Sequence, residues 1–147
     1  MPGKVSLREE QYYAHPRNLF WKILGEVLGF DSAVSYERRV GFLKSAEVAV
    51  WDVLQTCTRD SSLDSDIDDT TAIPNDFASF YANHPRVRRV CFNGAKAEAL
   101  YEKFVRPRLA HSESDLVYIR LPSTSPANAA VPYAERLRAW TAGIQPP

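Results

Sequence analysis

The sequence predicts an α/β protein in which helices cover both faces of a parallel sheet. Short apolar segments typical of strands alternate with stretches whose apolar residues recur at helical spacing. Segments rich in small polar residues follow the strands, as at the edge where such sheets bind ligands. With 147 residues, the chain is long enough for one domain with a hydrophobic core, so we expect a single domain over residues 1–147.

Five segments carry the signals of helices. In the first of them apolar residues recur at helical spacing, and Gly29 lies close to its end. Ser35 is the expected N-cap of the second, and Asp76 that of the third, which stops before Pro85. The expected helices are Pro16 to Phe30, Tyr36 to about Ala46, the segment after Asp76, Ala95 to Leu109 and Pro132 to Ala142.

Three apolar runs are expected to form strands, namely Val48 to Leu54, Val87 to Phe92 and Asp115 to Leu121. The segment from Thr58 to Asn75 is rich in Asp, Ser and Thr, so it is interpreted as a loop with at most one short turn. The chain opens on Met1-Pro2-Gly3 with no strand before it. A sheet of this type usually has a central first strand, so we expect that strand to be missing or to lie upstream.

Composition excludes several classes of protein. The formal net charge is zero, so DNA binding would need a local patch of positive charge. Two cysteines, Cys57 and Cys91, are too few for a disulfide framework, and a cytoplasmic location is expected. No stretch reaches the roughly 18 apolar residues of a membrane helix, and no signal peptide is evident. Three separated histidines form no zinc pattern, so no metal or other cofactor is expected.

The densest functional cluster lies between Tyr12 and Trp21, which includes four aromatic residues, His15 and Asn18. The start of a helix explains Pro16 and the packing of Trp21. It does not explain why the remaining polar and aromatic side chains gather at the same end. Aromatic faces beside amide donors suit a flat heterocycle, which stacks and forms hydrogen bonds at once.

Three further patterns have both an ordinary and a functional interpretation. Asn93-Gly94 is a common turn pair, but it also follows a strand, where ligands bind. The segment Pro122 to Asn128 offers hydroxyl and backbone N–H groups that can hold a phosphate, although composition alone favours a solvated loop. A basic excess between His84 and His111 suits either a DNA backbone or a solvated surface.

An acidic run contains five aspartates, Asp60, Asp64, Asp66, Asp68 and Asp69. Carboxylate oxygens suit magnesium, but the spacing matches no known ion-binding loop. We therefore interpret the run as a flexible solvated segment.

Four segments resemble, in chain order, the conserved motifs of the hypoxanthine-DNA glycosylases, one family of the uracil-DNA glycosylase superfamily. The first and most specific comprises Met1-Pro2-Gly3, Ser6-Leu7, Gln11-Tyr12-Tyr13-Ala14-His15-Pro16-Arg17-Asn18 and Phe20-Trp21. The others are Trp51-Asp52-Val53-Leu54 with Cys57 and Ser62-Leu63-Asp64, then Phe92-Asn93-Gly94, then Leu121-Pro122-Ser123-Thr124-Ser125-Pro126-Ala127.

The resemblance implies a three-layer α/β/α sandwich around a four-stranded parallel sheet. It also implies a monofunctional, metal-free enzyme that extrudes a damaged nucleotide and hydrolyses its N-glycosidic bond. The catalytic asparagines would be Asn18 and Asn93, and the stacking aromatic Phe20. Residues expected to bind the DNA are Pro2, Gly3, Tyr13, His15, Phe20, Asp52, Ser123, Thr124 and Ser125.

The expected partner is DNA with a deaminated base, bound by a monomer that is not attached to a membrane. Hypoxanthine is the expected base, with uracil and xanthine as further candidates. The loop of Pro122 to Ala127 contains no histidine, whereas the uracil-specific branch commonly has one, so efficient uracil removal is not expected. Two alternatives stay open: an inactive nucleic-acid-binding protein of the same fold, and a small-molecule nucleotide-binding α/β protein.

Overall fold

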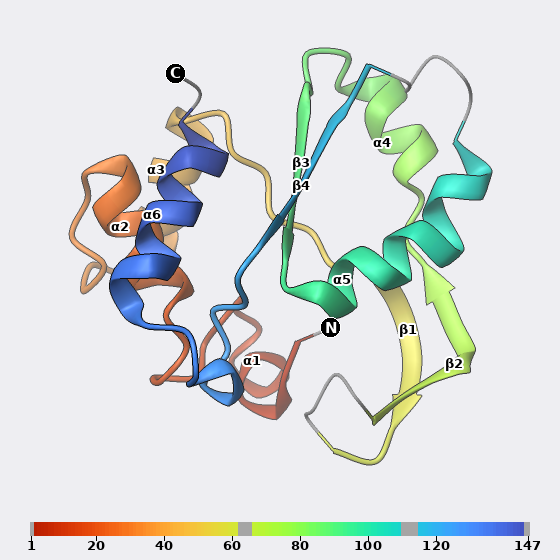
Figure 1. The fold of residues 1–147 in the computed structure, drawn as a ribbon, viewed down its shortest axis with the longest axis horizontal. Coiled ribbons are helices and arrows are strands. Elements are labelled where there is room, and N and C mark those ends of the chain that lie inside the picture. Colours follow the sequence, from red (N-terminus) through yellow and green to blue (C-terminus); the bar gives the residue numbers. More distant parts are fainter. Residues whose placement is uncertain (1, 62–65, 110–114, 146–147) are drawn as a thin grey trace. The chain divides into compact units, whose positions relative to one another are not determined.

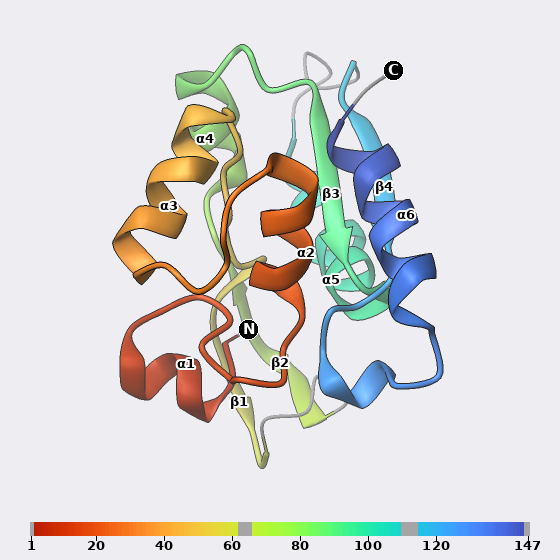
Figure 2. The same ribbon diagram turned by 90° about the vertical axis from the view of Figure 1, so that its left-hand side faces the viewer.

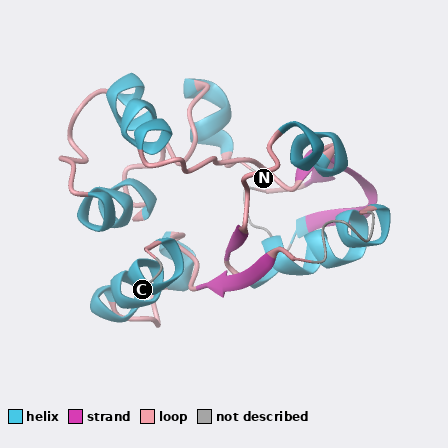
Figure 3. Cartoon of the chain, turned by 90° about the horizontal axis from the view of Figure 1, so that it is seen from above, coloured by secondary structure: helices cyan, strands magenta, loops and turns pink. Residues whose placement is uncertain are grey.

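The computed structural model describes residues 2–61, 66–109 and 115–145. The chain forms two compact units (Figure 1). The strand unit spans Asp52–Leu121, and the helical unit combines Pro2–Trp51 with Pro122–Pro147. All strands of the described chain belong to the strand unit, whereas the regular elements described in the helical unit are helices (Figure 3).

The strand unit contains two pairs of strands. Strand β1 (Leu54–Arg59) pairs with β2 (Ile67–Pro74) in antiparallel orientation. Strand β3 (Arg89–Asn93) pairs with β4 (Val117–Leu121) in parallel orientation. The register of this second pair sets Arg89 opposite Val117 and Asn93 opposite Leu121, so the two strands end at the same level.

The helices of the strand unit follow the sequence signals closely. Helix α4 (Phe77–Asn83) begins where expected, because the Asp76 side chain accepts a hydrogen bond from the backbone N–H of Ser79 at 3.0 Å. Helix α5 (Ala95–Leu100) continues as a π-helical turn, η2 (Tyr101–Val105), and a 3-10 turn, η3 (Arg106–Arg108). The expected helix from Ala95 therefore changes its hydrogen-bond pattern after Leu100.

Two apolar clusters hold the strand unit together. One contains the buried side chains of Phe77, Tyr81, Phe92, Tyr101 and Val105. The other contains Leu54, Ile67 and Leu100, so it joins β1 and β2 to α5. These clusters remove apolar surface from water on both pairs of strands.

Two expectations about the strand unit were wrong. The apolar run from Val48 is not a strand as far as Leu54; the strand begins at Leu54 and continues to Arg59. The segment from Thr58 to Asn75 is not mainly a loop, because β2 lies within it. Threonine and isoleucine favour extended backbone, and a strand at the edge of a two-stranded pair tolerates exposed aspartates.

The sheet also differs from the expected parallel arrangement. Within the described residues, parallel pairing is confined to β3 and β4, and β1 is antiparallel to its partner.

Ser62, Leu63 and Asp64, part of the second motif, lie outside the described residues, as does Met1.

The helical unit consists of α1 (Lys4–Glu9), α2 (Phe20–Leu28), α3 (Tyr36–Ser45), the 3-10 turn η5 (Pro126–Asn128) and α6 (Tyr133–Ile144). The Ser35 cap of α3 is confirmed, since its side chain accepts from the N–H of Arg38. Gly29 ends α2 with φ 77°, a conformation that favours glycine. Helix α2 begins at Phe20 rather than at Pro16, and α1 was not expected.

Helix α2 lies between α3 and α6 (Figure 2). It is apolar on most of its surface, and Ile23 and Leu24 are almost completely buried. Phe20 meets Trp140 of α6 edge to face with ring centroids 5.8 Å apart. At the rim, the Tyr133 hydroxyl donates to Glu26 at 2.6 Å. Among the described residues, no helix has the length and apolar character needed to cross a membrane.

Candidate active site

The first motif forms one connected structure in the helical unit. Gly3 precedes α1, and its carbonyl accepts from the N–H of Leu7 at 3.0 Å. Ser6 is buried in α1, and its hydroxyl accepts from the N–H of Ala14 at 3.1 Å. The Ser6 carbonyl accepts from the N–H of Gln11 at 3.1 Å. The hydrogen bonds of Ser6 therefore join the Pro2-Gly3 segment to the loop that precedes Asn18.

Asn18 lies at the entrance to α2, where its side chain is held in place. Its Oδ1 accepts from the N–H of Phe20 at 3.0 Å, which closes an Asx turn. Its own N–H donates to the carbonyl of His15 at 2.9 Å. The side chain is half-buried. The Asx turn uses one lone pair of Oδ1, and the second lone pair and the two N–H groups of Nδ2 take no part in it.

The aromatic residues of the motif pack in layers. Phe20 is only 4 % exposed, and the Tyr13 ring stacks on it with a centroid distance of 3.9 Å and an interplanar angle of 21°. Trp21 meets Phe20 edge to face at 5.1 Å. Tyr13 is half-buried, so of the two stacked rings it has the more accessible surface.

His15 has a defined hydrogen-bond role within the loop. Its Nδ1 accepts from the N–H of Arg17 at 3.1 Å. A ring nitrogen that accepts carries no proton, so the neutral imidazole has its proton on Nε2. His15 therefore provides an N–H donor from its half-exposed ring.

The segment from Pro122 to Asn128 is a closely bonded loop in the helical unit. Ser123 Oγ accepts from the N–H of Ser125 at 3.2 Å, and Ser125 Oγ accepts from the N–H of Ala127 at 3.2 Å. Thr124 is completely buried, and its carbonyl accepts from the N–H of Leu19 at 3.0 Å. Leu19 follows Asn18, so this hydrogen bond connects the loop to the candidate catalytic amide.

Asn93 belongs to the strand unit, where it is the last residue of β3. Gly94 follows with φ 93°, a conformation that other residues rarely adopt. The Gly94 N–H contacts the carbonyls of Phe92 and Leu121, each at 3.0 Å. The backbone turns here from β3 into α5, so half-buried Asn93 lies at the carboxyl end of the parallel pair.

Asp52 also belongs to the strand unit and is half-buried, two residues before the start of β1. Its carbonyl accepts from Nδ2 of Asn75 at 2.8 Å, and the carbonyl of Val53 accepts from the N–H of Asn75 at 3.0 Å. The two hydrogen bonds of Asn75 hold the backbone of Asp52 beside the end of β2.

The basic excess is partly neutralised by acidic side chains. Lys96 and Lys103 both contact Asp69, at 3.2 Å and 3.1 Å. Arg106 pairs with Glu102 at 2.8 Å. His111 lies outside the described residues. These pairs favour the interpretation of a solvated surface over a strong DNA-binding patch.

Part of the acidic run is ordered strand, which corrects the expectation of a flexible segment. Asp68 and Asp69 lie in β2. Hydrogen bonds from Lys103 and Lys96 lower the pKa of the Asp69 carboxyl. Within residues 2–61, 66–109 and 115–145, no group of three or more His, Cys, Asp or Glu residues is placed to hold a metal ion; Asp64 lies outside them.

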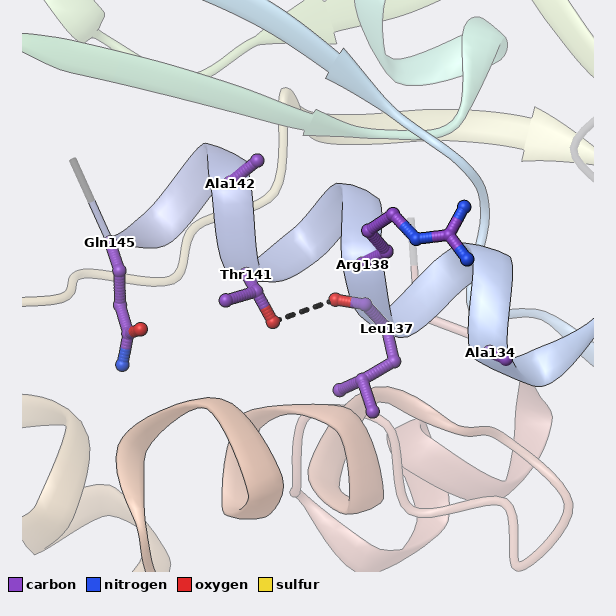
Figure 4. Close-up of a pocket in the computed structure, with 6 residues that line it drawn as sticks. All are labelled: Ala134, Leu137, Arg138, Thr141, Ala142 and Gln145. Atoms are coloured by element: carbon purple, nitrogen blue, oxygen red, sulfur yellow. Dashed lines mark hydrogen bonds between the residues drawn. The ribbon is translucent and has the colours of Figure 1, made fainter. Parts of the chain in front are cut away.

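An open groove runs along α6, and none of the predicted site residues lines it. Figure 4 shows its six lining residues, with the Thr141 hydroxyl bonded to the carbonyl of Leu137. They are Ala134, Leu137, Arg138, Thr141, Ala142 and Gln145. None of them carries acid–base or nucleophilic chemistry suited to a reaction, so we place the candidate active site elsewhere.

The helical unit thus contains most of the predicted site residues, and the strand unit contains Asp52 and Asn93. Three residues that organise the site were not among the predicted site residues: Ser6, Asn128 and Arg136. Ser6 and Asn128 lie within segments that the sequence had singled out, whereas Arg136 does not. Asn128 donates from Nδ2 to the carbonyl of Ser123 at 3.1 Å. The sequence has no signal for Arg136, because an arginine in a helix is usually exposed.

Comparisons with known proteins identify relatives of this chain. No family model matches the chain. It is 35% identical over 129 residues to the hypoxanthine DNA glycosylase of Methanosarcina acetivorans, an alignment that covers 87% of this chain and 76% of that protein. It is 36% identical over 107 residues to the hypoxanthine DNA glycosylase of Methanosarcina barkeri, covering 72% and 66% of the two chains.

A solved structure extends the comparison to the fold. The solution NMR structure of a candidate uracil DNA glycosylase from Methanosarcina acetivorans matches with a TM-score of 0.79 and 33% identity. The match covers 98% of this chain and 84% of that one. Fold and motifs together define a DNA glycosylase of the uracil-DNA glycosylase superfamily, an enzyme class that hydrolyses N-glycosyl bonds. Within that superfamily, the chain belongs to the hypoxanthine DNA glycosylase family.

Proposed function

We propose that the chain removes hypoxanthine from DNA, with uracil and xanthine as further candidate bases. The enzyme extrudes the damaged nucleotide and hydrolyses its N-glycosidic bond with water, without a covalent intermediate or a metal. The names of the two Methanosarcina relatives support the substrate class. We further propose that it acts as a monomeric single domain, a three-layer α/β/α sandwich, in the compartment that contains the DNA.

The observation that supports this proposal best is the fixed position of Asn18. Its Oδ1 is held by the N–H of Phe20, and the neighbouring N–H of Leu19 is bonded to Thr124. An amide that is oriented before the substrate arrives loses little freedom on binding. The hydrogen bond between Leu19 and Thr124 also holds the hydroxyl-rich loop of Ser123 to Ser125.

The two asparagines have different proposed roles. Cleavage of an N-glycosidic bond leaves positive charge on the sugar and negative charge on the departing base. Asn18 is too weak a base to deprotonate water, so it orients the attacking water through Oδ1 and Nδ2. Asn93 donates an N–H to the departing base and stabilises its developing charge.

The Ser123–Ser125 loop is proposed to hold a DNA phosphate. Both serine hydroxyl oxygens accept backbone N–H groups within the loop. Each O–H proton therefore remains available to donate to an outside acceptor. Bound phosphates beside the extruded nucleotide also favour the cationic sugar of the transition state.

The test uses an oligonucleotide with one deoxyinosine, followed by alkaline cleavage at abasic sites. Asn18→Ser keeps a side-chain oxygen that can accept from the N–H of Phe20 but lacks the amide, so stability changes by less than about 1 kcal/mol. We expect Asn18→Ser and Asn93→Ala each to lose at least about 100-fold in single-turnover rate, the typical cost of removing a stabilising donor.

Asn83→Ala is the matched control, because Asn83 is an exposed amide at the end of α4. It is expected to cleave like the wild type. Full activity in Asn18→Ser and Asn93→Ala would overturn the catalytic assignment. If the wild type binds DNA in a salt-sensitive way but releases no base, the result would favour an inactive nucleic-acid-binding protein. If it turns over free inosine or nucleotides without DNA, the result would favour a small-molecule enzyme.

A further inference from the structure

Arg136 is a buried arginine in the first turn of α6. It is only 3 % exposed. Its Nε donates to the carbonyl of Val131 at 3.0 Å, and its Nη2 donates to the carbonyl of Asn128. Its Nη1 is buried and has no hydrogen-bond partner among the described residues.

Buried arginines normally pair with carboxylates, because burying an isolated charge is unfavourable. Arg136 instead binds two backbone carbonyls that lie three residues apart, one at the end of η5 and one just before α6. A planar guanidinium holds two such acceptors in a fixed geometry. Its position therefore determines the path of the backbone from Asn128 to Val131.

A chain of hydrogen bonds leads from this segment to Asn18. The Asn128 side chain donates to the carbonyl of Ser123 at 3.1 Å. The next residue, Thr124, accepts through its carbonyl from the N–H of Leu19 at 3.0 Å, and Leu19 adjoins Asn18. Trp140, one turn beyond Arg136 on α6, donates from Nε1 to the carbonyl of Pro122 at 2.9 Å.

We propose that Arg136 is a positioning residue that fixes the loop of Ser123 to Asn128 and, through the hydrogen bond between Leu19 and Thr124, orients Asn18. The guanidinium touches neither base nor phosphate and acts through the backbone it holds. This inference rests on the proposed glycosylase function only for its kinetic consequence, since the loop geometry is present without DNA.

Three variants separate this role from a general effect on folding. Arg136→Lys keeps the charge but cannot hold two carbonyls in a planar fork. Asn128→Ala removes the side-chain hydrogen bond to Ser123 and leaves the carbonyl that binds Arg136. Arg138→Lys is the matched control, because Arg138 lies two residues further along α6 and is exposed.

The first measurement is amide hydrogen exchange in the protein without DNA, monitored by NMR. The Leu19 N–H reports on the loop because its acceptor is Thr124, whereas the Ile23 N–H donates within α2 to Leu19. We expect Arg136→Lys to accelerate exchange at Leu19 at least 10-fold and Asn128→Ala about 3-fold. Exchange at Ile23 is expected to stay unchanged in both, and Arg138→Lys to match the wild type at both sites.

The second measurement is single-turnover cleavage of deoxyinosine DNA at saturating enzyme. We expect Arg136→Lys to lower the cleavage rate at least 10-fold while its Kd for DNA changes less than 3-fold. Unchanged exchange at Leu19 in Arg136→Lys would overturn the proposal. If Arg136→Lys does not fold, unchanged exchange at Leu19 in Asn128→Ala would overturn it instead. An unchanged cleavage rate in Arg136→Lys, measured where the wild type is active, would also overturn it. An inactive wild type would refute the glycosylase function alone, and the exchange measurement would then decide the positioning role.

Discussion

Tyr13 and Phe20 illustrate how burial changes the expected role of a residue. The family resemblance assigns base stacking to Phe20, and that assignment stays a prediction. Phe20 is 4 % exposed, and Tyr13 covers one face of its ring at 3.9 Å. We therefore expect a base that enters the site to meet the half-exposed ring of Tyr13 before it meets Phe20. Tyr13 also has φ 54°, an uncommon conformation for a residue with a side chain.

Replacement of Tyr13 tests which ring receives the base. Stacking of a base on an aromatic side chain contributes about 1–3 kcal/mol. We expect Tyr13→Ala to weaken productive binding of deoxyinosine DNA by about 10-fold, and Tyr13→Phe to retain most of it. The measurement is the enzyme-concentration dependence of the single-turnover rate. Wild-type behaviour of Tyr13→Ala would show that the base does not use this ring.

Helices α2 and α3 each contain a glycine, and their surroundings give them opposite roles. A Cβ on Gly25 in α2 would lie 2.7 Å from the carbonyl oxygen of Phe30, because the chain folds back closely after α2 ends at Gly29. A Cβ on Gly41 in α3 would have no neighbour within 4 Å. Gly25 is therefore needed for packing, whereas Gly41 only weakens its helix.

Alanine at the two positions is expected to change stability in opposite directions. Gly41→Ala should raise the free energy of unfolding by about 0.5–1 kcal/mol, the usual difference in helix propensity. Gly25→Ala should lower it by about 1–3 kcal/mol, since the backbone at Phe30 must move. Urea denaturation measures both changes. Destabilisation by Gly41→Ala, or none by Gly25→Ala, would contradict this account.

Across the strand unit, Asp69 connects three elements. It lies in β2 and forms ion pairs with Lys96 of α5 and Lys103 of η2. Hydrogen bonds from Lys103 and Lys96 lower the pKa of the carboxyl below its ordinary value of 3.8. Since the folded state lowers this pKa, the pairs stabilise the protein above pH 3.8, and the contribution is lost as the pH falls through the folded-state pKa.

The variant Asp69→Asn isolates this contribution. Above about pH 5, it should be less stable than the wild type by at most about 1 kcal/mol, because the pairs are partly exposed and screened by solvent. The difference should shrink toward zero below the folded-state pKa. Denaturation from pH 2.5 to pH 7 measures it, and a difference that grows on acidification would contradict the sign.

At the scale of the molecule, local signals located most helices and the two parallel strands. The caps at Ser35 and Asp76 and the glycine at the end of α2 are confirmed, because a cap depends on residues within one turn. The antiparallel strand β2 was missed, because its pairing with β1 is decided by a partner across a turn. Its aspartates and threonines suggested a loop when considered alone.

The sequence by itself determined the α/β class and the family, because these depend on periodicity and on motifs of consecutive residues. The catalytic residues that the family resemblance implies stay predictions. Only the tertiary structure decided that Tyr13 covers Phe20, that Asp69 pairs with Lys96 and Lys103, and that Arg136 binds the carbonyls beside the Ser123 loop. Burial and hydrogen-bond partners are set by segments distant in the chain, which no local pattern of residues encodes.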